Sequence, residues 1–322
     1  MKKRSKKFDL KEASLLFKEN GNITKSAQMM CERLGIEYGE MYRHALSRYI
    51  KKKGLKKTTT LVKSPAKILI SDIETSFIKF YGFSPYNKFV QPDNMIEDWF
   101  LLTHSSKWLF EDKIFSFKLT KKELKNRDDR RLTEAMWQLL DEADIVVFYN
   151  GARFDQKKLN AKFLQYGLGL PRPYVLFDPI ITIKKRFGLT YSGLDAVAKL
   201  LGVEGKLETE KGLWHKVMNG DMDALDRMSK YNDRDILCLQ DVYLEIRPYA
   251  IQHPNIGLYI AEDVACCPTC GSENLNFDKN SDYFTMVNRF RAFQCNDCQS
   301  WGRERKALKI GNKNLTTNIA RI

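Results

Sequence analysis

The sequence lacks any run of about 18 consecutive apolar residues, which is the length that a membrane-spanning helix requires. Its first residues, MKKRSKK, are not followed by the apolar stretch of a secretory signal peptide. We therefore expect no membrane partner and a cytoplasmic location, which would be the host cytoplasm for a phage-encoded chain. Disulfides are rare in that compartment, so the seven cysteines are predicted to bind metal or to remain free thiols.

Acidic residues are scarce near the N-terminus. Residues 1–63 hold 17 Lys and Arg against 6 Asp and Glu, and so carry +11 of the net charge of +14. Residues 64–263 are close to neutral, and residues 264–322 carry +4. Basic ends around a neutral middle predict appendages that bind a polyanion beside a separate working domain. A generally basic surface is the alternative, and the concentration of charge at one end argues against it.

Three short helices are predicted in the basic N-terminal segment, over residues 8–20, 25–34 and about 38–53. Short helices joined by tight turns in a basic segment fit a helix-turn-helix, in which the third helix would enter the major groove of duplex DNA. A plain helical bundle that contacts protein is the alternative. We place this domain at residues 1–60, with the charged and Thr-rich residues 51–60 as a linker.

Residues 64–252 mix strand and helix patterns and predict an α/β domain with a mixed sheet flanked by helices. Strands are predicted at residues 67–75, 77–83, 99–108, 144–150 and 174–177. Helices are predicted at residues 128–142, 154–166, 178–202 and 221–247. The first three strands lie close together in sequence, so we expect them to form an antiparallel meander.

Two carboxylates follow the apolar run at the start of this domain, in the segment KILISDIET. Residues two apart on a strand share a face, so Asp72 and Glu74 are expected to point the same way from the end of a buried strand. Two unpaired carboxylates there would repel each other and would be costly to desolvate, and a divalent cation removes that cost. Strand-end surface residues are the alternative for this common tripeptide.

Further acidic residues follow the later predicted elements. Asn150 to Asp155, NGARFD, join the strand at 144–150 to the next helix, and Asp155 is expected to face back over the sheet edge. Tyr231 and Asp235 lie four apart on a helix and therefore share a face. Asp233 competes with Asp235 as a ligand but faces away from Tyr231 in a helix. Asp178, after the last strand, is expected to be structural.

Together the motifs D-x-E, N-G-x-x-F-D and Y-x-x-x-D follow one another in the order and contexts of a known family. They resemble the DEDDy-type 3′–5′ exonucleases, which are DnaQ-like members of the ribonuclease H-like superfamily. The resemblance covers roughly residues 66–250. None of the four histidines stands about five residues before Asp235, as the histidine-containing branch requires.

The resemblance implies a two-metal-ion mechanism in which carboxylates hold two Mg²⁺ or Mn²⁺ ions. By that analogy the catalytic residues are Asp72, Glu74, Asp155, Tyr231 and Asp235, of which the four carboxylates are the metal ligands. Tyr231 would orient the attacking water, because a phenol with a pKa near 10 is a poor base at neutral pH. The same analogy places Thr75, Asn150 and Phe154 against the terminal nucleotide.

The C-terminal segment, residues 264–322, carries two C-x-x-C pairs. Two such pairs at this spacing in a cytosolic protein predict a zinc ribbon with a structural Zn²⁺ on Cys267, Cys270, Cys295 and Cys298. Cys266 is an alternative to Cys267. Strands are predicted at 283–287 and 289–294, and the arginines there would let the ribbon bind nucleic acid, with protein contact as the competing use.

The leading functional hypothesis is a metal-dependent exonuclease that hydrolyses DNA from single-stranded 3′ ends and is held on DNA by the two appendages. The arrangement resembles bacteriophage nucleases, some of which act with a DNA polymerase, so a polymerase partner in trans is expected. The alternatives are a catalytically inactive ribonuclease H-like DNA-binding factor and an RNA-directed exonuclease. A helix-turn-helix favours duplex DNA over RNA, which other modules usually read.

Overall fold

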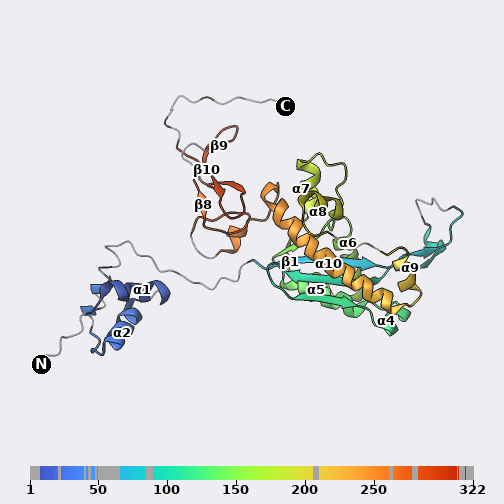
Figure 1. Ribbon diagram of the computed structural model, residues 1–322, viewed down its shortest axis with the longest axis horizontal. Helices are drawn as coiled ribbons and strands as arrows, with labels where there is room; N and C mark the ends of the chain where they lie inside the picture. The colour runs from blue at the N-terminus through green and yellow to red at the C-terminus, as the bar shows by residue number, and fades with distance from the viewer. Residues whose placement is uncertain are drawn as a thin grey trace. The chain divides into compact units, whose positions relative to one another are not determined.

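The computed structural model describes residues 8–20, 23–39, 41–42, 45–47, 49, 66–84, 90–205, 210–260, 264–277, 282–309, 311 and 316. The chain divides into two compact units, Met1–Ser64 with Ile260–Val264 and Pro65–Tyr259 with Ala265–Ile322. Figure 1 labels the elements of both. No helix of the described residues is long and apolar enough to cross a bilayer.

The first unit contains the helices α1 (Leu10–Asn20) and α2 (Ile23–Leu34). The Asp9 carboxylate accepts a hydrogen bond from the Lys11 backbone at 2.7 Å and so caps the start of α1. Both helices bury apolar residues in one shared cluster, which also takes in Leu46. The first two predicted helices are therefore confirmed. Of the third, residues 41–42, 45–47 and 49 are helical, and its remainder and the predicted linker lie outside the described residues.

A five-stranded mixed sheet, in the order β5-β4-β1-β6-β7, is the centre of the second unit (Figure 1). The strands are β1 (Ile68–Thr75), β4 (Leu101–Trp108), β5 (Ile114–Lys118), β6 (Ile145–Val147) and β7 (Val175–Phe177). β1 pairs antiparallel with β4 and parallel with β6, and β6 pairs parallel with β7. The predicted mixed α/β sheet is confirmed.

The predicted meander was wrong in one strand. Residues 77–83 do not join the central sheet, because only β2 (Lys79–Phe80) is extended, and it pairs with β3 (Met95–Glu97) in a separate hairpin. The aromatic residues there are mostly exposed and have no face to bury, so they gain nothing from a place in the sheet. The third strand of the meander is β5, which the sequence analysis did not predict.

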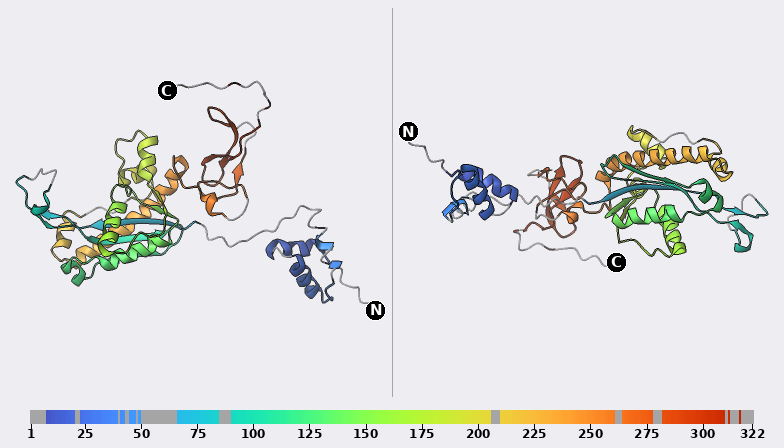
Figure 2. Two further views of the ribbon diagram at one scale, coloured as in Figure 1. Left: turned by 180° about the vertical axis from the view of Figure 1, so that it is seen from behind. Right: turned by 90° about the horizontal axis from the view of Figure 1, so that it is seen from below.

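Helices cover both faces of the sheet, and Figure 2 shows them in two layers. They are α4 (Lys121–Asn126), α5 (Arg130–Glu142), α6 (Asp155–Tyr166), α7 (Pro179–Arg186), α8 (Leu194–Leu201), α9 (Leu213–Met218) and α10 (Met222–Ile246). Short 3₁₀ turns lie at Pro92–Asn94, Arg247–Tyr249 and Ile256–Tyr259.

Alternation along β1 separates the two hydrophobic cores. Leu69 and Ile73 pack with α5 and α6 on one face of the sheet. Ile68 and Ile70 pack with α7, α8 and α10 on the other face. Asp72 and Glu74 continue the second series, because residues two apart on a strand share a face. The sheet therefore presents both carboxylates to the side that α10 covers.

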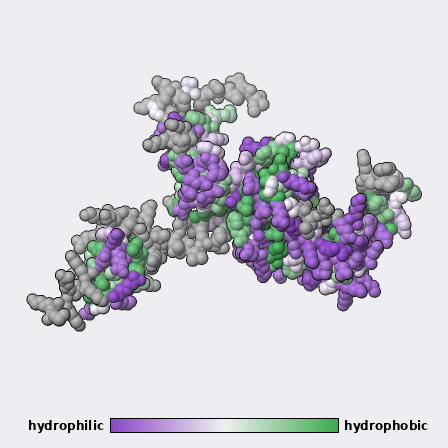
Figure 3. Space-filling model, in the orientation of Figure 1, coloured by the Kyte–Doolittle hydropathy of each residue, from purple (hydrophilic) through white to green (hydrophobic). Residues whose placement is uncertain are grey.

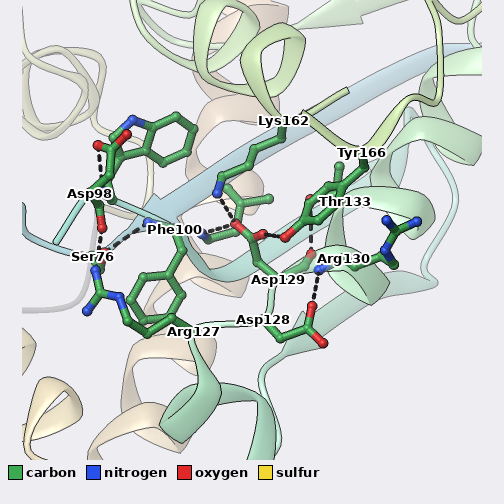
Figure 4. Close-up of polar contacts among 12 residues, drawn as sticks. Ser76, Asp98, Phe100, Arg127, Asp128, Asp129, Arg130, Thr133, Lys162 and Tyr166 are labelled. Atoms are coloured by element: carbon green, nitrogen blue, oxygen red, sulfur yellow. Dashed lines mark hydrogen bonds and ion pairs between the residues drawn. The ribbon is translucent and has the colours of Figure 1, made fainter. Parts of the chain in front are cut away.

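A buried ion pair connects three of these elements. The Asp129 carboxylate, fully buried before α5, lies 3.0 Å from the ammonium of Lys162 on α6. It also accepts a hydrogen bond from the Leu101 backbone at 2.7 Å and one from the Tyr166 hydroxyl. Figure 4 shows these groups meeting at Asp129. The network fixes α6 against β4 and α5.

The C-terminal part is a small antiparallel sheet, with β8, β10 and β11 in the order β11-β10-β8 and β9 paired to β10. Its strands are β8 (Leu275–Asn276), β9 (Asp282–Phe284), β10 (Arg289–Cys295) and β11 (Trp301–Arg303). The two predicted strands correspond to β9 and β10. Phe290 and Phe293 are buried, which is a small core for a sheet of this size.

Candidate active site

Three carboxylates from distant parts of the sequence meet between β1 and α10. Oxygens of Asp72, Glu74 and Asp235 all lie within 4.8 Å of one another. Asp72 and Glu74 are half-buried on β1, and Asp235 is buried on α10. The expectation that Asp235 points toward the Asp72 and Glu74 edge is met, although about 160 residues of chain separate it from them.

Asp155 lies beside this group. It is the first residue of α6 and is almost fully buried, rather than one turn into the helix as expected. Its oxygens are not among those that share the 4.8 Å limit. Burial, and then the negative charge of Asp72, raise the pKa of Asp155 well above its usual value. Asp155 and Asp72 are thus close enough to repel each other in a desolvated setting.

The turn between β6 and α6 positions Asp155. Asn150 has a positive φ of 65°, and a Cβ at Gly151 would lie 2.1 Å from the Cβ of Phe148, so only glycine fits there. The Asp178 carboxylate accepts hydrogen bonds from the backbone of Asn150 at 2.9 Å and of Ile180 at 3.2 Å. Asp178 therefore holds this turn and caps α7, which is the structural role expected of it.

Asn232 is a site residue that the sequence analysis missed. It is fully buried on α10, and its amide donates a hydrogen bond to Asp72 Oδ2 at 2.6 Å. Its own carbonyl oxygen accepts from the Thr103 hydroxyl of β4 at 3.3 Å. Asn232 thus fixes the orientation of the Asp72 carboxylate. In the sequence only its position, three residues before Asp235 in the same motif, pointed to it, and its burial appears only in the structure.

Asp233, the competing ligand, points elsewhere. Its carboxylate accepts a hydrogen bond from the Ser105 hydroxyl of β4 at 2.5 Å. Ser105 lies opposite Asp72 in the β1–β4 register. It follows Thr103 by two residues and therefore lies on the same face of β4. Asp233 is not a member of the described carboxylate cluster. The structure therefore brings Asp235, and not Asp233, to the Asp72 and Glu74 edge, and the assignment of Asp235 as a metal ligand stays a prediction.

The other predicted site residues lie at the edge of the cluster. Tyr231 is half-buried on α10, one turn before Asp235. Thr75 ends β1 just after a register shift, and its carbonyl oxygen accepts a hydrogen bond from Trp214 Nε1 at 3.2 Å. Phe154, next to Asp155, is 40% exposed, and the ammonium of Lys158 lies 5.6 Å from the centroid of its ring.

The donor set fits a hard divalent cation. Mg²⁺ and Mn²⁺ take oxygen ligands, and every member of the cluster supplies carboxylate oxygens. Burial first, and then the negative charge of Asp72, raises the pKa of Asp155, so both disfavour its ionised form in the protein alone. A bound cation would relieve the repulsion between Asp155 and Asp72.

The four predicted zinc ligands also converge. The Sγ atoms of Cys267, Cys270, Cys295 and Cys298 lie within 4.8 Å of one another. All four are free thiols, with Cys267 Sγ 3.6 Å from Cys298 Sγ and Cys270 Sγ 3.6 Å from Cys295 Sγ. These separations are far longer than a disulfide bond and suit a tetrahedral thiolate site. Cys266 is not part of the group, so the 267/270 spacing is preferred.

Comparison with known proteins bears on the fold. A family model described as the RNase_H superfamily (RNase_H_2) matches residues 106–246. No curated protein matches the chain. Among solved structures, the family B DNA polymerase from the hyperthermophilic archaeon Pyrobaculum calidifontis is similar, with 19% sequence identity and a TM-score of 0.41. That similarity covers 57% of this chain and 26% of the polymerase chain, so the chain spans about a quarter of the polymerase's length.

The matched segment begins within β4 and ends with α10, so it contains Asp155, Asp235 and Asn232 and excludes β1. The central sheet with helices on both faces is the predicted ribonuclease H-like architecture. The α/β unit of this chain therefore has a ribonuclease H-like fold, and its residues 106–246 match the RNase H superfamily model.

Proposed function

We propose that the chain is a metal-dependent 3′–5′ exonuclease that hydrolyses phosphodiester bonds of DNA from single-stranded 3′ ends. The observation that carries the proposal is the convergence of Asp72, Glu74 and Asp235 beside the buried Asp155. An ordinary strand end would not gather carboxylates from three elements against the cost of their repulsion. The ribonuclease H-like fold supports a reaction on nucleic acid.

The protein's own residues would hold the reactants in the proposed reaction. Asp72, Glu74, Asp155 and Asp235 would hold two Mg²⁺ or Mn²⁺ ions, which supply charge neutralisation and an activated water when bound. Asn232 keeps the Asp72 carboxylate in place through its 2.6 Å hydrogen bond.

The remaining site residues would position the water and the substrate. Tyr231, one turn from Asp235, would orient the attacking water through its hydroxyl. Phe154 would stack on the terminal base, and Thr75 and Asn150 would contact the terminal nucleotide.

The appendages complete the proposal. We assign residues 1–60 to a helix-turn-helix that binds duplex DNA, residues 64–252 to the exonuclease domain, and residues 264–322 to a zinc ribbon. The excess of 17 basic over 6 acidic residues in the first 63 supports the assignment of the N-terminal part to a polyanion. The proposed partner in trans is a DNA polymerase, and the test is removal of a mismatched 3′ nucleotide during primer extension.

The central test compares Asp235→Asn with Asp233→Asn. Both variants remove one carboxylate from α10, but only Asp235 belongs to the cluster. With 5′-labelled single-stranded DNA and Mg²⁺, the wild type and Asp233→Asn should release nucleotides stepwise from the 3′ end, whereas Asp235→Asn should lose about 10³-fold or more in rate. EDTA should abolish hydrolysis.

Three outcomes would overturn the proposal. Equal activity of Asp235→Asn and the wild type would show that the cluster is not catalytic. A wild type that binds DNA but never cleaves it would identify a binding factor. Cleavage of single-stranded RNA but not DNA would identify an RNA-directed exonuclease.

A further inference from the structure

A cavity separate from the carboxylate cluster lies at one end of the α/β unit. It has a volume of about 600 Å³. Its walls are the β2–β3 hairpin, α4 and the turn that follows α9. Figure 1 shows these three elements together at one end of the sheet, and Figure 3 shows mostly hydrophilic residues over α4 and α9 at that end. No residue of the carboxylate cluster lines it.

The cavity carries uncompensated positive charge. Lys79, Lys121 and Lys125 line it, and among the described residues no carboxylate lies within ion-pairing distance of these three. The acidic residues nearby are already engaged. Glu97 pairs with Arg127 at 2.9 Å, and Glu123 pairs with Arg131 at 2.8 Å. Three lysines that line the same cavity, without an ion pair to a carboxylate among the described residues, are suited to an anionic ligand.

The helix α9 connects the cavity to the proposed active site. Trp214, near the start of α9, donates its hydrogen bond to the carbonyl of Thr75, which directly follows Glu74. Asn219 and Gly220, just past the end of α9, line the cavity. Five residues of helix rise about 8 Å at 1.5 Å per residue. A strand with its 3′ end at the carboxylates would therefore need only a few nucleotides to reach the cavity.

The hairpin that forms one wall also exposes aromatic rings. Phe77, Tyr81 and Phe83 are 46%, 74% and 102% exposed, respectively. These rings do not line the cavity itself, but they belong to the same segment as Lys79, which does. Exposed rings and lysines on one segment match unpaired nucleic acid, which offers both phosphates and base faces for stacking. A free phosphate would leave the rings unused, and duplex DNA would keep its bases stacked within the helix.

We propose that this cavity binds the phosphates of the unpaired strand a few nucleotides upstream of the 3′ end, with Lys121 and Lys125 as the main contacts. The inference rests on the proposed function for the direction of the strand. Lys121 and Lys125 lie four residues apart on α4 and therefore present their ammonium groups on one face. Arg127 holds the wall rather than the ligand, because it pairs with Glu97 and stacks on Phe100 at 4.4 Å.

The test measures binding of oligothymidylates to the full chain by fluorescence anisotropy in EDTA, where no hydrolysis occurs. Lys121→Gln/Lys125→Gln is compared with Lys122→Gln, because Lys122 is exposed on the same helix but does not line the cavity. The double variant should weaken binding of a dodecamer by about tenfold or more. It should also lower the slope of log Kobs against log salt by about 1.4, since each phosphate contact on a single strand contributes about 0.7.

Substrate length separates this site from the active site. A dimer is too short to reach the cavity from the carboxylates, so the double variant and the wild type should have the same affinity for it, which is weak where EDTA removes the cations. Equal dodecamer affinity in the wild type, the double variant and Lys122→Gln would overturn the inference, and so would an equal loss for the dimer and the dodecamer. A selective dodecamer loss in a chain that never cleaves DNA would refute the exonuclease proposal and leave the phosphate site standing.

Discussion

The buried network around Asp129 allows a quantitative prediction about stability. Asp129 has a fully buried side chain, Lys162 is 5% exposed, and their charged atoms lie 3.0 Å apart. Removing one charge from such a pair leaves the other buried without a counter-ion, which costs about 3–5 kcal/mol. We therefore expect Lys162→Met and Asp129→Asn each to lower the free energy of unfolding of the α/β unit by about that amount. The asparagine keeps an oxygen that can accept the hydrogen bond from the Leu101 backbone.

The double variant decides between this account and simple loss of packing. Asp129→Asn/Lys162→Met removes both charges, so it should be less destabilised than the sum of the single variants by about 2–3 kcal/mol. Urea unfolding followed by tryptophan fluorescence is the assay, because the ring of Trp99 lies 4.7 Å from the Lys162 ammonium. Lys199→Met breaks the exposed pair with Asp195 and should change stability by less than about 0.5 kcal/mol. Single variants that cost under about 1 kcal/mol, with additive effects, would refute the reasoning.

Three further predictions concern acid stability, the site and the ribbon. Burial lowers the pKa of His104 from 6.5 to about 3, so the free energy of unfolding should fall as pH falls below about 6.5, by up to about 5 kcal/mol near pH 3. The variant His104→Phe should depend less on pH in this range. Parallel plots of the free energy of unfolding against pH for the variant and the wild type would contradict this account. Asn232→Ala removes the hydrogen-bond donor to Asp72 and should lower the rate of metal-dependent hydrolysis by about 10- to 100-fold. The circular dichroism spectrum should stay unchanged. An unchanged rate would show that Asn232 does not position Asp72. Atomic emission should find one zinc per chain. The variant Cys295→Ser should lose the zinc, and its ribbon should become sensitive to protease. A wild type that contains no zinc and resists protease would refute the predicted zinc site.

Much of the α/β fold follows from local sequence pattern. The apolar runs that precede Asp72 and Asn150 predicted β1 and β6, and the helix over residues 221–247 matches α10 within a residue. Alternation along β1 was enough to put Asp72 and Glu74 on one face, and helical spacing was enough to prefer Asp235 over Asp233. These successes depend on periodicity, which burial of one face imposes directly.

The failures concern polar burial and strand pairing over longer range. All eight residues of β4 are buried, including Thr103 and Ser105, because the buried polar side chains of α10 pair with that strand. No single-strand pattern reveals such a pairing, so Asn232 was missed. The strand predicted at 77–83 was misplaced because its aromatic composition resembles that of a core strand, although Phe77, Tyr81 and Phe83 are exposed.

The assembly of the carboxylate cluster from β1 and α10 has a consequence for synthesis. A ribosome makes β1 first and α10 much later, so Asp72 and Glu74 leave it long before Asp235. A nascent or truncated chain that stops before α10 lacks Asp235 and also the amide that orients Asp72. If the chain acts as proposed, incomplete products of translation would be inactive, and nuclease action would begin only once α10 has covered the sheet.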